Sequence, residues 1–120
     1  MVTVSTMARL SSSRDISFET DAGAARIRWD GPRATLFLDG VESSAVDTSD
    51  PTYLEFEYMQ HMSAVVRAVW GAQDRFRALH VGGAACALAC AWSASYPSSR
   101  HVAVEVDRLL AAQVREHFPI

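Results

Sequence analysis

The N-terminal third of the chain alternates apolar and polar residues in short runs that turn residues separate. Ala24–Trp29 and Arg33–Leu38 are predicted strands, and the aspartate-glycine-proline sequence between them is a strong turn signal. An aspartate-glycine dipeptide then leads to a possible third strand over Val41–Val46. Residues 1–15 show no such period and are expected to be a flexible tail. We therefore predict a small antiparallel β-meander over residues 16–47.

The apolar period changes to that of a helix after the meander. Asp50 followed by Pro51 is typical of a helix N-cap and first helical position, so a helix is predicted from there to about Trp70, ended by Gly71. Apolar residues recur at spacings of three and four along it. This stripe, which we expect to be buried, comprises Phe56, Met59, Met62, Val66 and Val69.

The last part of the chain has the order strand, glycine turn, helix, strand, helix. The apolar strand Arg77–Val81 runs into Gly82-Gly83 and an alanine-rich helix that ends at about Ser95. A second strand is predicted at His101–Glu105 and a second helix at Asp107–His117. This order is typical of a βαβ unit with a parallel sheet. The predicted class is α/β: an N-terminal meander followed, over residues 48–120, by a linking helix and a truncated Rossmann-like βαβα unit.

Composition excludes several classes of function. All eleven basic residues are arginine, so no lysine base or Walker-A lysine is present. The net charge is −3 and the arginines are scattered, which argues against nucleic acid or a membrane surface as partner. No apolar run approaches the ~20 residues of a membrane span, and no secretory signal opens the chain. We therefore expect a soluble, cytoplasmic protein.

The cysteines and histidines do not form a metal-ligand pattern. Cys86 and Cys90 are four residues apart rather than three, and no second pair accompanies them. In an alanine-rich helix that spacing places both thiols on one face, where they act as small buried hydrophobic residues. No pair of histidines has the HExxH spacing. No metal site is predicted.

The turn after the strand Arg77–Val81 is the strongest candidate for chemistry. Gly82 and Gly83 allow the backbone to bend sharply and approach a ligand at the following helix N-terminus, although the strict GxGxxG pattern is absent because Ala84 stands at a usual glycine position. Glu105 ends the next strand, about twenty residues on, where a carboxylate can accept hydrogen bonds from both ribose hydroxyls. Together they favour a nucleoside site over an ordinary tight turn.

Four short motifs follow one another along residues 34–118. They are Leu36-Phe37-Leu38-Asp39-Gly40-Val41, Asp50-Pro51-Thr52-Tyr53-Leu54-Glu55, Leu79-His80-Val81-Gly82-Gly83 and Val104-Glu105-Val106-Asp107. In order and spacing the chain resembles the N-terminal portion of the spermidine synthase (polyamine aminopropyltransferase) family, within it the divergent bacterial spermidine synthase-like proteins. The resemblance implies a β-domain before a Rossmann-like methyltransferase fold. It also implies transfer of an aminopropyl group from decarboxylated S-adenosylmethionine to a diamine, which leaves methylthioadenosine.

The resemblance assigns roles to four residues. Glu105 would hold the ribose, the backbone of Gly82 and Gly83 would approach the nucleoside, and Tyr53 would border the amine pocket. A carboxylate suits a diol, and a tyrosine offers both a wall and a hydroxyl.

Three polar positions of the family are replaced in this chain. A glutamine is Ser43, a histidine or glutamine is Leu54, and the aspartate that holds the donor's cationic amine is Ala85. The family's catalytic aspartate lies further along than Ile120, so the catalytic residue is unknown here.

We therefore expect a spermidine synthase-like protein truncated before its catalytic base. It would not transfer aminopropyl groups alone, would need no cofactor, and would keep residual binding of decarboxylated S-adenosylmethionine or methylthioadenosine. Two alternatives remain: half of an aminopropyltransferase that a partner chain completes, and a non-catalytic structural or oligomerisation subunit. Because a two-stranded parallel sheet leaves an edge unpaired, a homo-oligomer or a partner chain is expected to complete it.

Overall fold

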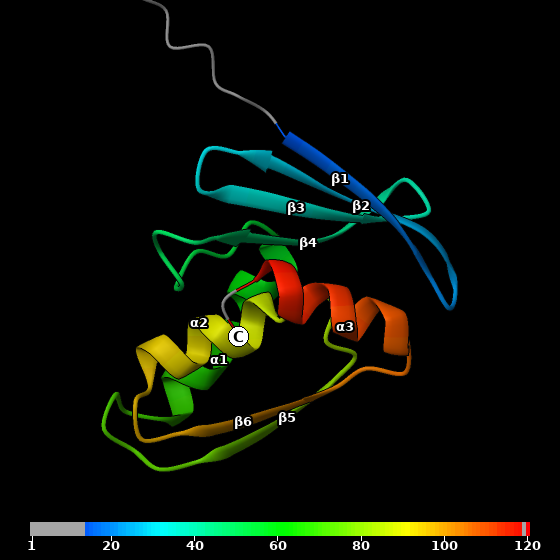
Figure 1. Ribbon diagram of the computed structural model, residues 1–120. Helices are drawn as coiled ribbons and strands as arrows, with labels where there is room; N and C mark the ends of the chain where they lie inside the picture. The colour runs from blue at the N-terminus through cyan, green and yellow to red at the C-terminus, as the bar shows by residue number, and fades with distance from the viewer. Residues whose placement is uncertain (1–13, 119) are drawn as a thin grey trace, which may run out of the picture.

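The computed structural model describes residues 14–118 and 120, which form two sheets with three helices between them (Figure 1). An antiparallel sheet has the order β1-β2-β3-β4, and a parallel pair is formed by β5 and β6. The elements are β1 (Arg14–Thr20), β2 (Gly23–Asp30), β3 (Arg33–Leu38), β4 (Val41–Asp47), α1 (Glu57–Val69), β5 (Arg77–Val81), α2 (Ala87–Ser95), β6 (Arg100–Val104) and α3 (Arg108–His117). The α/β class, with a meander followed by a βαβα unit, is as predicted.

The meander contains one strand more than the sequence predicted. β1 pairs with β2 along its whole length. Arg14 and Asp15, which were assigned to the tail, belong to this strand, and residues 1–13 of the predicted tail lie outside the described residues. Only Ile16 and Phe18 alternate with polar residues here, so the period was too short to identify an edge strand.

The helix α1 begins several residues later than predicted. Asp50 does not cap it: its side chain accepts hydrogen bonds from the backbone N–H and the hydroxyl of Thr52, and its carbonyl accepts from the N–H of Tyr53. The Asp50-Pro51 pair therefore forms an isolated turn. The helix starts at Glu57 after an extended Phe56 that provides no side-chain cap.

The prediction of a buried stripe on α1 is wrong, because no residue of the helix is buried. Met62 is 45% exposed and Val69 is 66% exposed. One side of the helix is half-buried against α2, where the indole Nε1–H of Trp92 donates to Ser63 Oγ at 2.7 Å. The opposite side of the helix is exposed.

The strands β5 and β6 are parallel, as predicted, with Leu79 opposite Val102 and Val81 opposite Val104. The connection through α2 places that helix on one face of the pair, which is where Figure 1 shows all three helices. β6 ends at Val104, one residue earlier than predicted, so Glu105 follows the strand. Among the described residues, the outer edges of β5 and β6 pair with no further strand.

The core lies between the meander and α3. Ile27 and Leu36 from the sheet pack with Leu110 and Val114 of α3, and all four are essentially inaccessible to solvent. Burial of each such side chain contributes roughly 1.5–3 kcal/mol. Phe118 extends this core by stacking on a tryptophan of β2. The core therefore fixes the βαβα unit against the meander.

Asp107 joins the start of α3 to the β1–β2 turn. Its carboxylate accepts from the N–H of Leu110 (2.8 Å) as an N-cap and from the N–H groups of Asp21 and Ala22 (both 3.1 Å). Asp21 returns the contact, because its carboxylate accepts from the N–H of Arg108 at 2.8 Å. Burial tends to raise the pKa of Asp107, but these N–H donors outweigh it and hold the pKa below its usual value.

In the described part of the chain, no helix combines the length and hydropathy that crossing a membrane requires.

Candidate functional site

The turn after β5 has a strained backbone. Gly82 has a φ of +88°, which glycine adopts without strain, and its N–H continues the sheet by donating to the carbonyl of Val104. Ala84 (φ 43°) and Cys86 (φ 58°) also lie in the left-handed region, at a cost of roughly 1–2 kcal/mol for a residue with a side chain. Ala84 stands at a position that is glycine in the GxGxxG pattern. The turn keeps the shape of a glycine-rich loop with fewer glycines.

Glu105 holds this turn directly. One carboxylate oxygen, Oε2, accepts from the N–H of Gly83 (3.1 Å) and of Ala84 (3.2 Å), and Oε1 accepts from the N–H of Asp107 (3.1 Å). Burial tends to raise the pKa of Glu105, but the three N–H donors outweigh it and lower the pKa. The structure therefore brings together Glu105 and the glycines that the sequence predicted as one site.

The acceptor capacity of Glu105 is largely used. A carboxylate offers about four lone-pair positions, and three of them are occupied here. One hydroxyl can be added without loss, whereas a diol displaces at least one N–H of the turn. Binding of a ribose would therefore be coupled to movement of the backbone at Gly83 or Ala84.

A cavity of about 370 Å³ lies beside the turn. It is bounded by Gly82, Gly83 and Ala84, by the middle of β4, and by α1 and α2. Ser44 in its wall is 1% exposed, and its hydroxyl has no hydrogen-bond partner among the residues that the structure describes. The sequence analysis considered Ser43 and missed Ser44. The register of β3 and β4 pairs Ser44 with the buried residue Leu36.

Tyr53 lies at a different cavity. Its ring stacks under the guanidinium of Arg33 at 4.4 Å, and its hydroxyl donates to Glu55. That hydrogen bond raises the pKa of Tyr53. The 280 Å³ cavity beside Tyr53 reaches the turn only through Ala85 and Ala87, so the structure does not place Tyr53 in the cavity bounded by Gly82 and Gly83.

The two cysteines are half-buried free thiols, of which Cys86 is the left-handed residue just before α2 and Cys90 lies within that helix. The N–H of Cys90 donates to the carbonyl of Cys86, as the four-residue spacing in a helix requires. Burial raises the pKa of both thiols, which keeps them protonated and poorly reactive. Over residues 14–118 and 120, no three histidine, cysteine or acidic residues are arranged to hold a metal ion.

A histidine pair that the sequence analysis did not identify, His80 and His101, lies between β5, β6 and α2. Ser99 donates its one proton to the carbonyl of Tyr96 (2.6 Å), so it accepts from His101 Nε2 (2.6 Å). His101 Nδ1 then accepts from His80 Nε2 at 3.1 Å. The rings of Trp92 and Phe76 adjoin the pair. Burial lowers the pKa of both histidines, so both are neutral in this chain of hydrogen bonds.

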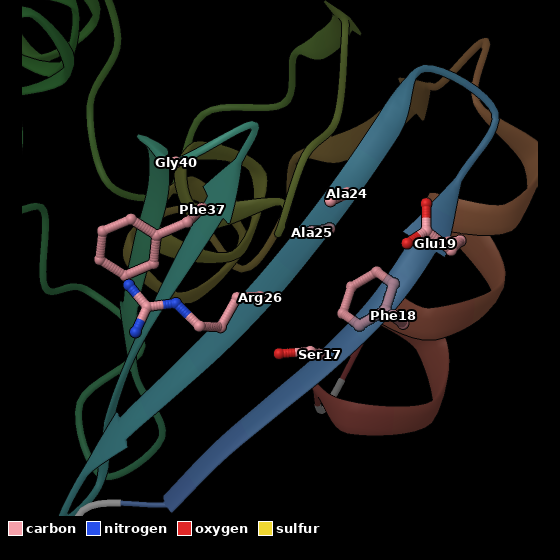
Figure 2. Close-up of a pocket in the computed structure, with 8 residues that line it drawn as sticks. All are labelled: Ser17, Phe18, Glu19, Ala24, Ala25, Arg26, Phe37 and Gly40. Carbon is pink, nitrogen blue, oxygen red and sulfur yellow. The ribbon is translucent and has the colours of Figure 1, made fainter.

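A further cavity lies on the meander, away from the predicted site. Figure 2 shows the guanidinium of Arg26 beside the ring of Phe37, at 4.4 Å from the ring centroid. The cavity measures about 370 Å³ and is formed by β1, β2 and the end of β3. None of the sequence-predicted site residues contributes to its wall.

Comparison with known proteins supports the resemblance drawn from the motifs. No protein-family model and no curated protein matches the sequence. The chain is similar to a solved structure, the crystal structure of a probable spermidine synthase from Corynebacterium glutamicum ATCC 13032, with 32% sequence identity and a TM-score of 0.77. The similarity covers 88% of this chain and 40% of that chain. In sequence and fold, the chain is thus similar to part of that probable spermidine synthase, and it spans less than half of that protein's length.

Proposed function

We propose that this chain is a spermidine synthase-like protein whose turn after β5 binds a nucleoside derived from S-adenosylmethionine. The observation that carries the proposal is the contact of the Glu105 carboxylate with the N–H groups of Gly83 and Ala84. A strand-end carboxylate beside such a turn is suited to a ribose diol. The similarity to a probable spermidine synthase supports the same class of ligand.

The cavity beside the turn suits such a ligand. Its volume of about 370 Å³ lies within the roughly 300–1,000 Å³ of small-molecule sites. Aliphatic and sulfur-containing side chains form much of the wall, and the unpartnered hydroxyl of Ser44 offers a polar contact. Methylthioadenosine combines an adenosine with a thioether, so its chemistry matches this wall, and decarboxylated S-adenosylmethionine is the charged counterpart. No further cofactor is needed for binding.

We propose that this chain does not transfer aminopropyl groups on its own. Ala85 replaces the aspartate that the family uses for the donor's amine, and it is 2% exposed within the apolar core. Ser43 donates its hydroxyl to the carbonyl of Val41, and Leu54 has no polar side chain. Nothing at these positions binds or deprotonates a diammonium substrate.

One alternative keeps a specific observation in its favour. The turn glycines and Glu105 are in contact, as a functional nucleoside half-site requires, so a partner chain that carries a base and an amine pocket would complete an enzyme. A reaction that appears only when a second polypeptide is added distinguishes this alternative from a non-catalytic subunit.

Calorimetric titration with methylthioadenosine tests the proposed function. The unmodified chain should bind in the micromolar range, and Glu105→Gln, which keeps one oxygen for the turn, should weaken binding at least about tenfold. Glu116→Gln, at an exposed position on α3, is the matched control and should bind normally. Circular dichroism establishes that each variant is folded. Absence of heat at millimolar ligand, or equal binding by Glu105→Gln, contradicts the proposal.

A kinetic assay tests the proposal that the chain does not transfer aminopropyl groups on its own. With decarboxylated S-adenosylmethionine and a diamine, the chain alone should release no methylthioadenosine. Turnover by the chain alone would overturn the proposal that it is incompetent, while leaving the nucleoside site intact.

A further inference from the structure

A chain of hydrogen bonds runs from the loop before β6 to the cavity beside the glycine turn. The hydroxyl of Ser99 donates its proton to the carbonyl of Tyr96, so its oxygen accepts from His101 Nε2–H. A neutral imidazole carries one N–H, so His101 Nδ1 is a bare acceptor, to which His80 Nε2–H donates at 3.1 Å. By the same rule, the Nδ1 atom of His80 carries no proton and is an acceptor.

The free acceptor of His80 opens on the cavity. His80 forms part of the cavity wall together with Ala103, its partner in the strand register. Among the described residues nothing donates to His80 Nδ1, and this atom is not one of the buried unpartnered atoms, so a ligand can reach it. Ala103 is on the α2 side of β6 and is nevertheless exposed, because the cavity lies over it.

The rest of the cavity wall favours a neutral ligand. Among the described residues that form the wall, none has a charged side chain. An ionised ligand group would lose its hydration there without a counter-charge, which disfavours the sulfonium and ammonium groups of decarboxylated S-adenosylmethionine. The indole Nε1–H of Trp92 is already donated to Ser63. Methylthioadenosine, which is uncharged, is therefore the better match, and His80 Nδ1 is a ready acceptor for it.

His80 and Glu105 lie at a separation that one nucleoside can span. A Cβ atom placed on Gly83 would meet the Cβ atoms of both Ala103 (3.6 Å) and Glu105 (3.8 Å), so these two residues share a side. Glu105 is two residues beyond Ala103, hence about 7 Å further along the strand direction than His80. With the ribose diol on Glu105, the exocyclic amine of the adenine is the one donor group that methylthioadenosine has left.

We propose that Ser99, acting through His101, fixes His80 as a hydrogen-bond acceptor in this cavity and so selects a nucleoside whose base carries an amine over one that carries a carbonyl. This selection rests on the nucleoside site proposed above. An amine donates to His80 Nδ1, whereas a carbonyl would set two acceptors against each other. For His80 to donate instead, both imidazoles must change tautomer and the Ser99 hydroxyl must leave the carbonyl of Tyr96. His80 is thus the contact residue and Ser99 a positioning residue.

NMR of the imidazole nitrogens tests the tautomers without any ligand. In the unmodified chain at pH 7.5, His80 should be protonated at Nε2 and bare at Nδ1. Ser99→Ala removes the acceptor of His101 Nε2–H, so the populations should shift toward the opposite tautomers. Ser99→Thr keeps the hydroxyl and should keep the original tautomers. A proton on His80 Nδ1 in the unmodified chain overturns the proposal.

Calorimetric titration with two nucleosides tests the selection. Methylthioadenosine should bind at least about tenfold more tightly than methylthioinosine, in which a carbonyl replaces the amine. His80→Phe, which has a ring without an acceptor, and Ser99→Ala, which frees the tautomers, should each reduce this ratio to within a few-fold of one. Ser99→Thr should retain it. Ser98→Ala, at an exposed serine of the same loop, is the matched control and should also retain it.

The ratio of the two affinities separates selection from a general loss of structure, because a partly unfolded variant loses both nucleosides together. Equal affinity of the unmodified chain for the two nucleosides overturns the selection by His80, and full discrimination by Ser99→Ala overturns the role of Ser99. If methylthioadenosine binds without discrimination, the selection is wrong and the proposed function stands. If neither nucleoside binds, the proposed function and the selection both fail.

Discussion

Ala84 adopts a left-handed backbone conformation that only glycine adopts without strain, next to the N–H groups that hold Glu105. Because a side chain there raises the energy of the folded state, Ala84→Gly should increase the free energy of unfolding by about 0.5–1 kcal/mol. Urea denaturation measures the change.

The control substitution should change the free energy of unfolding in the opposite direction. Ala64→Gly lies in the exposed middle of α1 and should lower stability by about 1 kcal/mol, because glycine is a poor helix former. Equal losses from the two substitutions would contradict the strain assigned to Ala84.

The pair His80 and His101 makes stability depend on pH. Burial lowers the pKa of both side chains in the folded chain, so the unfolded chain takes up protons first as the pH falls below about 6.5. The free energy of unfolding should therefore be highest above pH 6.5 and should decrease between pH 6.5 and pH 5. A second contribution arises because a proton on His101 Nδ1 removes the acceptor for His80.

Urea denaturation at pH 7.5 and pH 5.5 measures this dependence. Replacing both His80 and His101 by glutamine should flatten it, whereas His61→Gln, on exposed α1, should leave it unchanged. A double variant that retains the pH dependence of the unmodified chain would show that other groups cause it.

At the scale of the elements, Asp107 links α3 to the β1–β2 turn. Asp107→Ala removes the N-cap and both contacts to Asp21 and Ala22, so it should destabilise the chain and speed amide exchange in that turn. Asp107→Asn should be milder, because asparagine caps helices well but has one oxygen for donors that now use two.

Urea denaturation and amide hydrogen exchange together measure whether Asp107→Ala has a larger effect than Asp107→Asn. Asp74→Ala, which loses a local contact to the N–H of Gly71, is a control that should leave exchange at the β1–β2 turn unchanged. Alanine and asparagine variants at position 107 that both match the unmodified chain would contradict the linking role.

The elements differ in how far local sequence determined them. Strands β2 to β4 and the βαβα order could be predicted, because alternation and turn residues are local signals. The start of α1 could not, since an aspartate followed by proline is compatible both with a helix N-cap and with the isolated turn that Asp50 forms. Exposure of the apolar stripe on α1 could not be predicted either, because periodicity identifies a stripe but not its partner.

The candidate site, too, has some features that the sequence predicts and others that depend on tertiary structure. Gly82, Gly83 and Glu105 could be placed together because a parallel βαβ unit brings the ends of neighbouring strands to one edge. The separation of Tyr53 from that edge depends on the path of residues 48–56, which has no regular period. Ser44 was detectable from alternation in β4, but the absence of a hydrogen-bond partner is a tertiary property.

At the scale of the whole molecule, the helices lie between two sheets that are covered to different extents. The meander is covered on its inner face by α3, whereas the β5–β6 pair has an exposed face and, among described residues, two open edges. The candidate cavity lies on the other side of the pair, among the turn after β5, α1, α2 and β4. A nucleoside in the cavity would therefore contact elements of both sheets and two of the helices.

The central claim is that the turn held by Glu105 is a nucleoside site, and backbone amide NMR during titration with methylthioadenosine tests it most directly. Because a ribose diol must displace an N–H from the carboxylate, the amide signals of Gly83 and Ala84 should shift strongly and saturate with the ligand. Signals near Tyr53, at the separate cavity, should move little. Shifts confined to Tyr53 and its neighbours, or no saturable shift at the turn, would contradict the account.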